Sequence, residues 1–74
     1  APGWSPAARE LAEALDDAGE AAEAVAVLRR NAARSPLDPL AHGFLAEWLW
    51  EAGESAEALD RVKLALRLEP GYDW

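Results

Sequence analysis

The side chains able to do chemistry are few, and the single histidine is the first of them. His42 follows Asp38 by four residues, so one helical turn can bring the two together as half of a metal site. The sequence has no second histidine and no cysteine to complete a typical site. We therefore expect His42 to pack near a helix start or to make a local hydrogen bond. Three serines fall at expected helix starts or ends, and none lies in a nucleophile-elbow pattern: Ser5, Ser35 and Ser55.

Carboxylates form the second candidate group. Glu13 and Glu47 can face one another if the chain repeats at the interval that separates them. Acid and base catalysis requires a deep pocket that desolvates one member of such a pair, and none is expected here. The sequence also lacks a glycine-rich phosphate loop and, without cysteine, any thiolate site. We expect no enzyme activity and no cofactor. The alternative is a recognition arm for an active site elsewhere in a larger enzyme.

Length and charge restrict the partners. A chain of 74 residues forms one small domain at most. Its net charge of -7, from 14 acidic and 7 basic side chains, repels nucleic acids and anionic lipid surfaces, so a basic protein or peptide is the favoured partner. The sequence has no apolar run of the roughly 20 residues that cross a bilayer, and it opens without a signal-peptide pattern. We expect a soluble chain of unknown location, the cytoplasm being slightly favoured.

An internal repeat organises the chain. Shifting the sequence so that Ser5 falls on Pro39 aligns alanines, leucines, glycines and prolines in a single register without a gap. The aligned identities include Leu11 with Leu45, Ala12 with Ala46, Gly19 with Gly53, Ala24 with Ala58 and Pro36 with Pro70. We call two residues separated by this interval counterparts. Self-similarity at a fixed interval is the signature of stacked helical or solenoid units.

Each repeat predicts two helices joined by a tight corner. Ser5-Pro6 and Asp38-Pro39 pair an N-cap residue with proline at the first helical position. Gly19 and Gly53 supply residues that can leave the helical region at the corners. The expected fold is all-α, with four antiparallel helices at about 6–18, 20–34, 39–52 and 54–68. Apolar residues at helical spacing form the expected core: Leu11, Leu15, Val25, Leu28, Ala32, Leu45, Leu49, Leu59, Val62 and Leu66.

This pattern of helix starts and glycine corners resembles the tetratricopeptide repeat, whose tandem helix-turn-helix units build an α-solenoid. The resemblance covers residues 5–38 and 39–72, with 1–4 and 73–74 as ends of neighbouring repeats. It is carried by matching positions in the second copy: Leu45, Ala46, Leu49, Ala52, Gly53, Ala58, Val62, Ala65 and Pro70. Small Ala46 and Ala58 are expected where the two helices cross. The sequence departs from the family pattern at Ala8, Asn31 and His42. The resemblance implies a protein-protein interaction module and leaves the ligand open.

The resemblance also implies a binding site, because the first helix of each repeat lines a concave groove in this family. The positions that match are Arg9, Glu13, Asp16, Asp17, Gly43, Glu47, Trp50 and Glu51. Members that clamp a C-terminal carboxylate carry Lys, Asn and Arg on this surface, and only Arg9 is of those types. We expect an acidic groove for a basic peptide, the alternative being a solvated face. Trp50 either stacks on a ligand or covers a seam between helices.

Aromatic residues at other positions are expected to serve in packing. Trp48 and Phe44, four residues apart, are expected to pack against the first repeat. Pro2-Gly3-Trp4 mirrors Pro70-Gly71-Tyr72 at twice the repeat interval, so we expect an excerpt of a longer array. Trp4 and Trp74 are then exposed and pack on another copy or on parent sequence. A structural role in self-association is therefore the other alternative to peptide binding.

Overall fold

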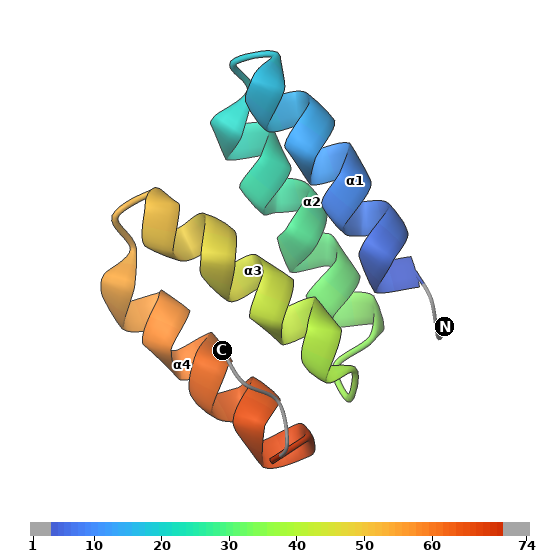
Figure 1. Ribbon diagram of the computed structural model, residues 1–74, viewed down its shortest axis with the longest axis vertical. Coiled ribbons are helices and arrows are strands. Elements are labelled where there is room, and N and C mark those ends of the chain that lie inside the picture. The colour runs from blue at the N-terminus through green and yellow to red at the C-terminus, as the bar shows by residue number, and fades with distance from the viewer. Residues whose placement is uncertain (1–3, 71–74) are drawn as a thin grey trace.

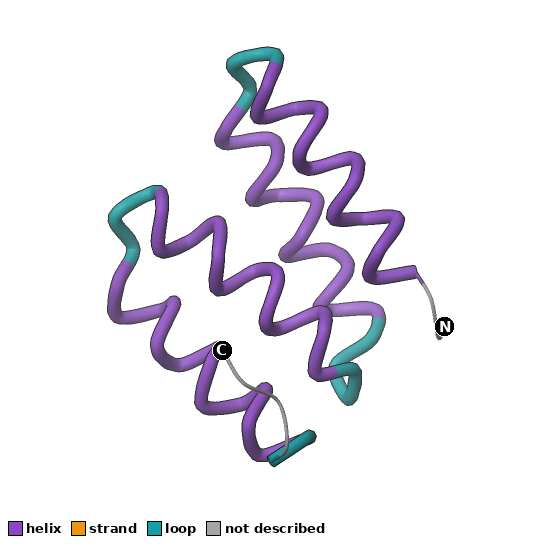
Figure 2. The backbone as a smooth tube through the Cα atoms, viewed as in Figure 1, coloured by secondary structure: helices purple, strands orange, loops and turns teal. Residues whose placement is uncertain are grey.

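The chain folds into two helical hairpins that lie side by side (Figure 1). A computed structural model describes residues 4–70, and within them every regular element is a helix. The helices are α1 (Trp4–Asp17), α2 (Ala21–Arg34), α3 (Pro39–Glu51) and α4 (Ser55–Leu68). Helix α3 packs on both helices of the first hairpin, and short loops join consecutive antiparallel helices (Figure 2). The expected all-α fold of four antiparallel helices is confirmed. The features expected at Pro2, Gly3, Gly71, Tyr72 and Trp74 lie outside the described residues.

The two helix starts differ from one another. Asp38 caps α3 as expected, because its Oδ1 accepts a hydrogen bond of 3.0 Å from the backbone amide of Leu40, with Pro39 at the first position. The same role predicted for Ser5 is wrong, because α1 already includes Trp4 and Ser5 lies inside the helix. Ser5 is fully buried, and its hydroxyl donates to Asp38 Oδ2 at 2.6 Å. A tertiary contact therefore takes the place of the local cap.

Both hairpin corners are closed in the same way. Gly19 and Gly53 have φ of 82° and 83°, the left-handed region that glycine adopts without strain. The amides of Glu20 and Glu54, one residue further on, each donate at 2.8 Å to carbonyls five residues earlier, those of Leu15 and Leu49. These bonds satisfy the last carbonyls of α1 and α3 and fold the second helix back on the first.

The core lies between the helices of each hairpin and between the hairpins. It comprises Ala12, Ala24, Leu28, Ala32, Ala41, Leu45, Leu49 and Ala58. Leu15, Val25, Phe44 and Trp48 pack against it and are partly buried. Ala46 is buried as well.

Part of the expected core is exposed. Leu11, Leu59 and Leu66 were predicted inside, and the structure leaves all three exposed, with Val62 only partly buried. Leu28, Ala32, Leu45 and Leu49, by contrast, are buried as predicted. The exposed leucines lie on α1 and α4, and no further hairpin covers these two helices within residues 4–70. Helical spacing identifies an apolar face and does not show whether a neighbour covers it.

Polar contacts join the hairpins at the start of α3. Asn31 was a departure from the family pattern, and its buried Nδ2 donates to Ser5 Oγ at 3.0 Å. Ser5 thereby links the end of α2 to Asp38 at the start of α3. None of the helices in residues 4–70 is both long enough and apolar enough to cross a bilayer.

Candidate functional site

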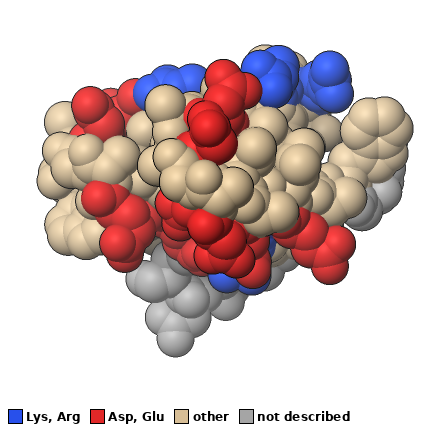
Figure 3. All heavy atoms as spheres, turned by 90° about the horizontal axis from the view of Figure 1, so that it is seen from above, with Lys and Arg blue, Asp and Glu red and all other residues tan. Residues whose placement is uncertain are grey.

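Acidic side chains gather at the ends of the first helix of each hairpin. Asp16 and Asp17 are the last two residues of α1, and Glu51 is the last of α3. Neither helix has a basic residue in its last turn, so these carboxylates meet the negative end of the helix dipole. Figure 3 views the molecule from the side of the α1–α2 corner and shows Asp and Glu spread over much of that face.

Arg9 lies between two carboxylates that are counterparts in the repeat. Its Nη1 is 3.4 Å from Glu13 Oε1, and its Nη2 is 3.5 Å from Glu47 Oε2. The guanidinium carbon also lies 5.2 Å from the ring centroid of Phe44 and 5.9 Å from that of Trp48. Glu13 and Glu47 therefore share the cation of Arg9, which lies between these two carboxylates. The contacts with both rings hold the arginine at the seam between α1 and α3.

A cavity of about 620 Å³ opens beside this seam. Its floor is apolar and comes from both helices of the second hairpin: Gly43, Ala46, Ala58, Leu59 and Val62. Its rim carries Asp16 from α1 with Glu47 and Glu51 from α3, and none of its lining residues is basic. Trp48 and Trp50 complete the lining. We call this cavity and its rim the acidic groove.

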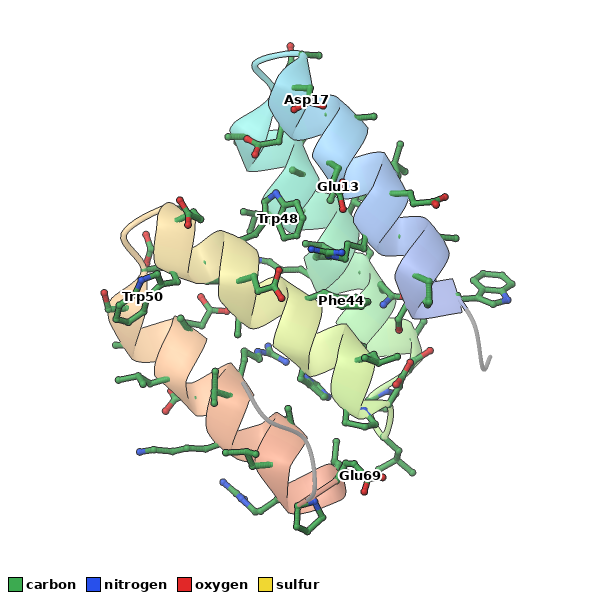
Figure 4. All side chains as sticks on the ribbon, in the orientation of Figure 1. Glu13, Asp17, Phe44, Trp48, Trp50 and Glu69 are labelled. Atoms are coloured by element: carbon green, nitrogen blue, oxygen red, sulfur yellow. The ribbon has the colours of Figure 1, made fainter. Side chains whose placement is uncertain are left out.

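The two tryptophans of α3 differ in their surroundings (Figure 4). Trp48 lies between α3 and the first hairpin, where it packs on the core together with Phe44, as predicted. Its Nε1 is buried and has no hydrogen-bond partner among the described residues. Trp50 lies on the other side of α3, near the start of α4, and its side chain is 59% exposed. Such an exposed ring covers little of a seam and is available to a ligand.

The structure places the predicted groove residues in three groups. Asp16, Gly43, Glu47, Trp50 and Glu51 come together in the lining of the acidic groove. Arg9 and Glu13 lie next to Glu47 through the contacts described above. Asp17 is exposed at the end of α1 and does not line the cavity.

Sequence reasoning missed the contribution of α4 to the groove. Leu59 and Val62 were predicted as core residues, whereas they form part of its floor. The signal that could have shown their exposure is their place in the second copy. Their counterparts Val25 and Leu28 are covered by α3, and no helix after α4 lies within the described residues to cover Leu59 and Val62.

His42 has a structural role. Its ring is buried, and Nε2 donates to the carbonyl of Pro36 at 2.8 Å. Nδ1 then accepts from Arg61 Nη1 at 3.1 Å, so both ring nitrogens have a hydrogen-bond partner. The expected local hydrogen bond is confirmed, and its acceptor is the carbonyl of Pro36. Within residues 4–70, His and carboxylate side chains form no group of three able to hold a metal ion.

One ion pair outside the groove joins the two hairpins. Arg29 of α2 binds both carboxylate oxygens of Glu57 in α4, with Nη2 at 2.9 Å from Oε1. The hydrogen bond from Arg29 lowers the pKa of Glu57 and, reciprocally, raises the pKa of Arg29, against a smaller opposing effect of desolvation.

Comparison with known proteins identifies no relative. No protein-family model matches the sequence, and no curated protein and no solved structure matches it.

Proposed function

We propose that this chain is a protein-binding module of the tetratricopeptide type that holds a basic protein segment in the acidic groove. The observation that supports this best is the composition of the cavity, which combines an apolar floor, three carboxylates and an exposed tryptophan without any basic residue. Concave sites of this size with a few convergent polar groups are the usual places for ligands.

The lining defines the chemistry of the partner. An aliphatic side chain suits the floor, where small Gly43 and Ala46 leave room beside Leu59. A neighbouring Arg or Lys suits the rim, where its charge can meet Glu51 and its stem can lie against the ring of Trp50. Anionic ligands, including a C-terminal carboxylate, are disfavoured because the three carboxylates repel them.

Direct binding to synthetic peptides tests the proposal. The probe is a fluorescein-labelled peptide of alternating Arg and Leu, with matched peptides in which Gln or Glu replaces every Arg. Fluorescence anisotropy should show binding of the Arg peptide and none of the Glu peptide. Affinity should fall as the salt concentration rises, because exposed charges are screened beyond about 10 Å at 0.1 M. Equal affinity for all three peptides would contradict the proposal.

Single substitutions then locate the site. Trp50→Ala and Glu51→Gln should each weaken binding of the Arg peptide by about two- to fivefold, the range of an exposed cation-π contact or ion pair. Glu69→Gln is the matched control, because it removes the same charge at the far end of α4, away from Trp50 (Figure 4). The site is elsewhere if the control weakens binding as much as Glu51→Gln does.

A further inference from the structure

The two hairpins bury matching residues to very different extents. Leu45 is 0% exposed, whereas Leu11, its counterpart in the first repeat, is 51% exposed. Ala32 is 2% exposed, whereas its counterpart Leu66 is 37% exposed. Each residue has the same partner helix within its own hairpin, so the difference comes from the neighbouring hairpin. Leu45 and Ala32 face the interface between hairpins, and their counterparts occupy the equivalent positions at the two outer ends of the molecule.

The two outer ends each carry an apolar cavity, and their charges are opposite. The α3–α4 end is the floor of the acidic groove, whose charged lining residues are all carboxylates. The α1–α2 end has a cavity of about 500 Å³, and its charged lining residues are Arg30 and Arg34. Trp4, 56% exposed, and Leu11 lie in the lining of this second cavity.

These ends match the two sides of an interface that the molecule already contains. The floor residues Ala46, Ala58, Leu59 and Val62 are the counterparts of Ala12, Ala24, Val25 and Leu28, which belong to the core or pack against it in the first hairpin. Helix α3 covers that first-hairpin surface. Helix α1, which matches α3 in the repeat, presents the exposed Leu11 at the position of the buried Leu45.

We propose that a second copy of this chain docks head to tail, its α1–α2 end covering the α3–α4 end of the first copy. The contact repeats the arrangement of the two hairpins within one chain. Such an interface joins two different surfaces, so every dimer still presents one free surface of each kind and association continues beyond the dimer.

The repeat specifies individual contacts between copies. Arg29 and Glu57 pair across the internal interface, and their counterparts are Lys63 of one copy and Glu23 of the next, again of opposite charge. The internal hydrogen bond from Ser5 to Asp38 becomes an apolar contact between Pro39 of one copy and Trp4 of the next. This contact gives the exposed Trp4 a partner.

The large side chain at the seam comes from opposite surfaces in the interface within one chain and in the interface between copies. Inside the chain, α3 contributes Trp48 to the seam, opposite Asp16 at the end of α1. Between copies, the counterpart of Trp48 is the small Ala14, and the counterpart of Asp16 is Trp50. A large side chain therefore lies at the edge of the seam in both interfaces, and between copies it comes from the other surface.

A docked copy and the aliphatic side chain of the peptide share the apolar floor of the acidic groove, whereas the charged rim is left to the peptide alone. In the first hairpin, α3 covers the apolar surface and still leaves Glu13 and Asp16 exposed. By the same geometry a docked copy covers Leu59 and Val62 and leaves Glu47 and Trp50 exposed on a longer groove. Self-association therefore does not depend on the proposed peptide ligand, and either can fail without the other.

Complementary surface variants test the head-to-tail arrangement. Leu11→Glu blocks one end and Leu59→Glu blocks the other, and both side chains are half exposed, so each variant should keep the helical circular dichroism of the unmodified chain. In sedimentation velocity, the unmodified chain should grow in mass with concentration, and each variant alone should remain a monomer. An equimolar mixture of the two should form a 1:1 dimer and nothing larger, since one intact surface of each kind remains.

Several outcomes would overturn the proposal. The first is an unmodified chain that stays monomeric up to about millimolar concentration. The second is self-association of Leu11→Glu alone. The third is a mixture of the two variants that stays monomeric. The Arg-Leu peptide is measured on Leu11→Glu, whose groove residues are unchanged. Binding there without self-association separates failure of this proposal from failure of the proposed function.

A charge exchange tests the residue pair. Lys63→Glu should lower the association constant by about fivefold, the upper range for an exposed ion pair, and Glu23→Lys should do the same. The double variant should restore association, because every contact again joins opposite charges. Arg67→Glu, the same charge change at another exposed site on α4, is the control and should have a smaller effect. Failure of the double variant to recover would refute the assigned pairing.

Discussion

Replacing Ser5 by alanine tests the buried contact that sets the start of α3 against the first hairpin. The Ser5 hydroxyl donates to the Asp38 carboxylate at 2.6 Å and accepts from Asn31 Nδ2 at 3.0 Å. A hydrogen bond to a charged group contributes about 1.5–3 kcal/mol, and a buried donor left without a partner costs about 1–3 kcal/mol. Asn31 is only 5% exposed, so water cannot easily replace the hydroxyl. We expect the free energy of unfolding to fall by about 2–4 kcal/mol after allowing for the better helix propensity of alanine.

Urea and thermal unfolding followed by far-ultraviolet circular dichroism measure this loss. The midpoint temperature should drop by at least about 8 °C, at roughly 4–8 °C per kcal/mol for a domain of this size. Ser55→Ala is the matched control, because Ser55 is exposed at the start of α4, and it should change stability by less than about 0.5 kcal/mol. Equal effects of the two serine substitutions would refute the reasoning.

A double-mutant cycle with Asn31→Ala isolates the shared contact. Once Asn31 is absent, Ser5→Ala no longer orphans a buried amide, so the two losses should fall short of additivity by about 1 kcal/mol. Additive losses within about 0.3 kcal/mol would show that the network does not couple the two residues.

Two further substitutions test a corner and an ion pair. Gly53→Ala should destabilise by about 1–2 kcal/mol through backbone strain alone, because φ is +83° and no residue other than the two chain neighbours comes within 4 Å of the added Cβ. Urea unfolding measures this loss of stability, and Gly53→Asn should lose less stability than Gly53→Ala. An alanine variant as stable as the unmodified chain would show that the corner changes conformation without strain. Glu57→Gln should cost under about 1 kcal/mol at neutral pH, because the side chain of Arg29 is 46% exposed. Arg29 lowers the pKa of Glu57, so this stabilisation is present above the ordinary carboxyl pKa and is lost as pH falls through the folded-state pKa. Unfolding of both proteins over an acid pH series should show the difference vanishing, and a difference independent of pH would contradict the assignment.

The helices and corners could be predicted from sequence because their causes are local. Positive φ at Gly19 and Gly53 follows from the need for a residue without a Cβ at a tight corner. The cap at Asp38 follows from a carboxylate two residues before a free amide at a helix start. Ser5 has the same local pattern, and yet its hydroxyl is used across the fold. A pattern of neighbours along the chain cannot contain a partner 33 residues away.

The candidate site could be predicted in part. The repeat and the family resemblance selected Asp16, Glu47, Trp50 and Glu51, and the structure places all four in one cavity. They did not select Leu59, because helical spacing places it on an apolar face and does not show whether a neighbouring element covers that face. Arg9 was selected as a groove residue, but its position between two carboxylates and over two rings depends on how α1 and α3 cross.

By itself, the sequence determined the repeat interval, the four helices and their corners, since each depends on backbone preferences or on spacing along the chain. The tertiary structure alone decided which apolar faces are covered. Leu45 and Leu11 occupy the same position in identical helical spacing, and the first is buried while the second is half exposed. The reason is that burial depends on a neighbour, and a neighbouring hairpin is a property of the packed molecule.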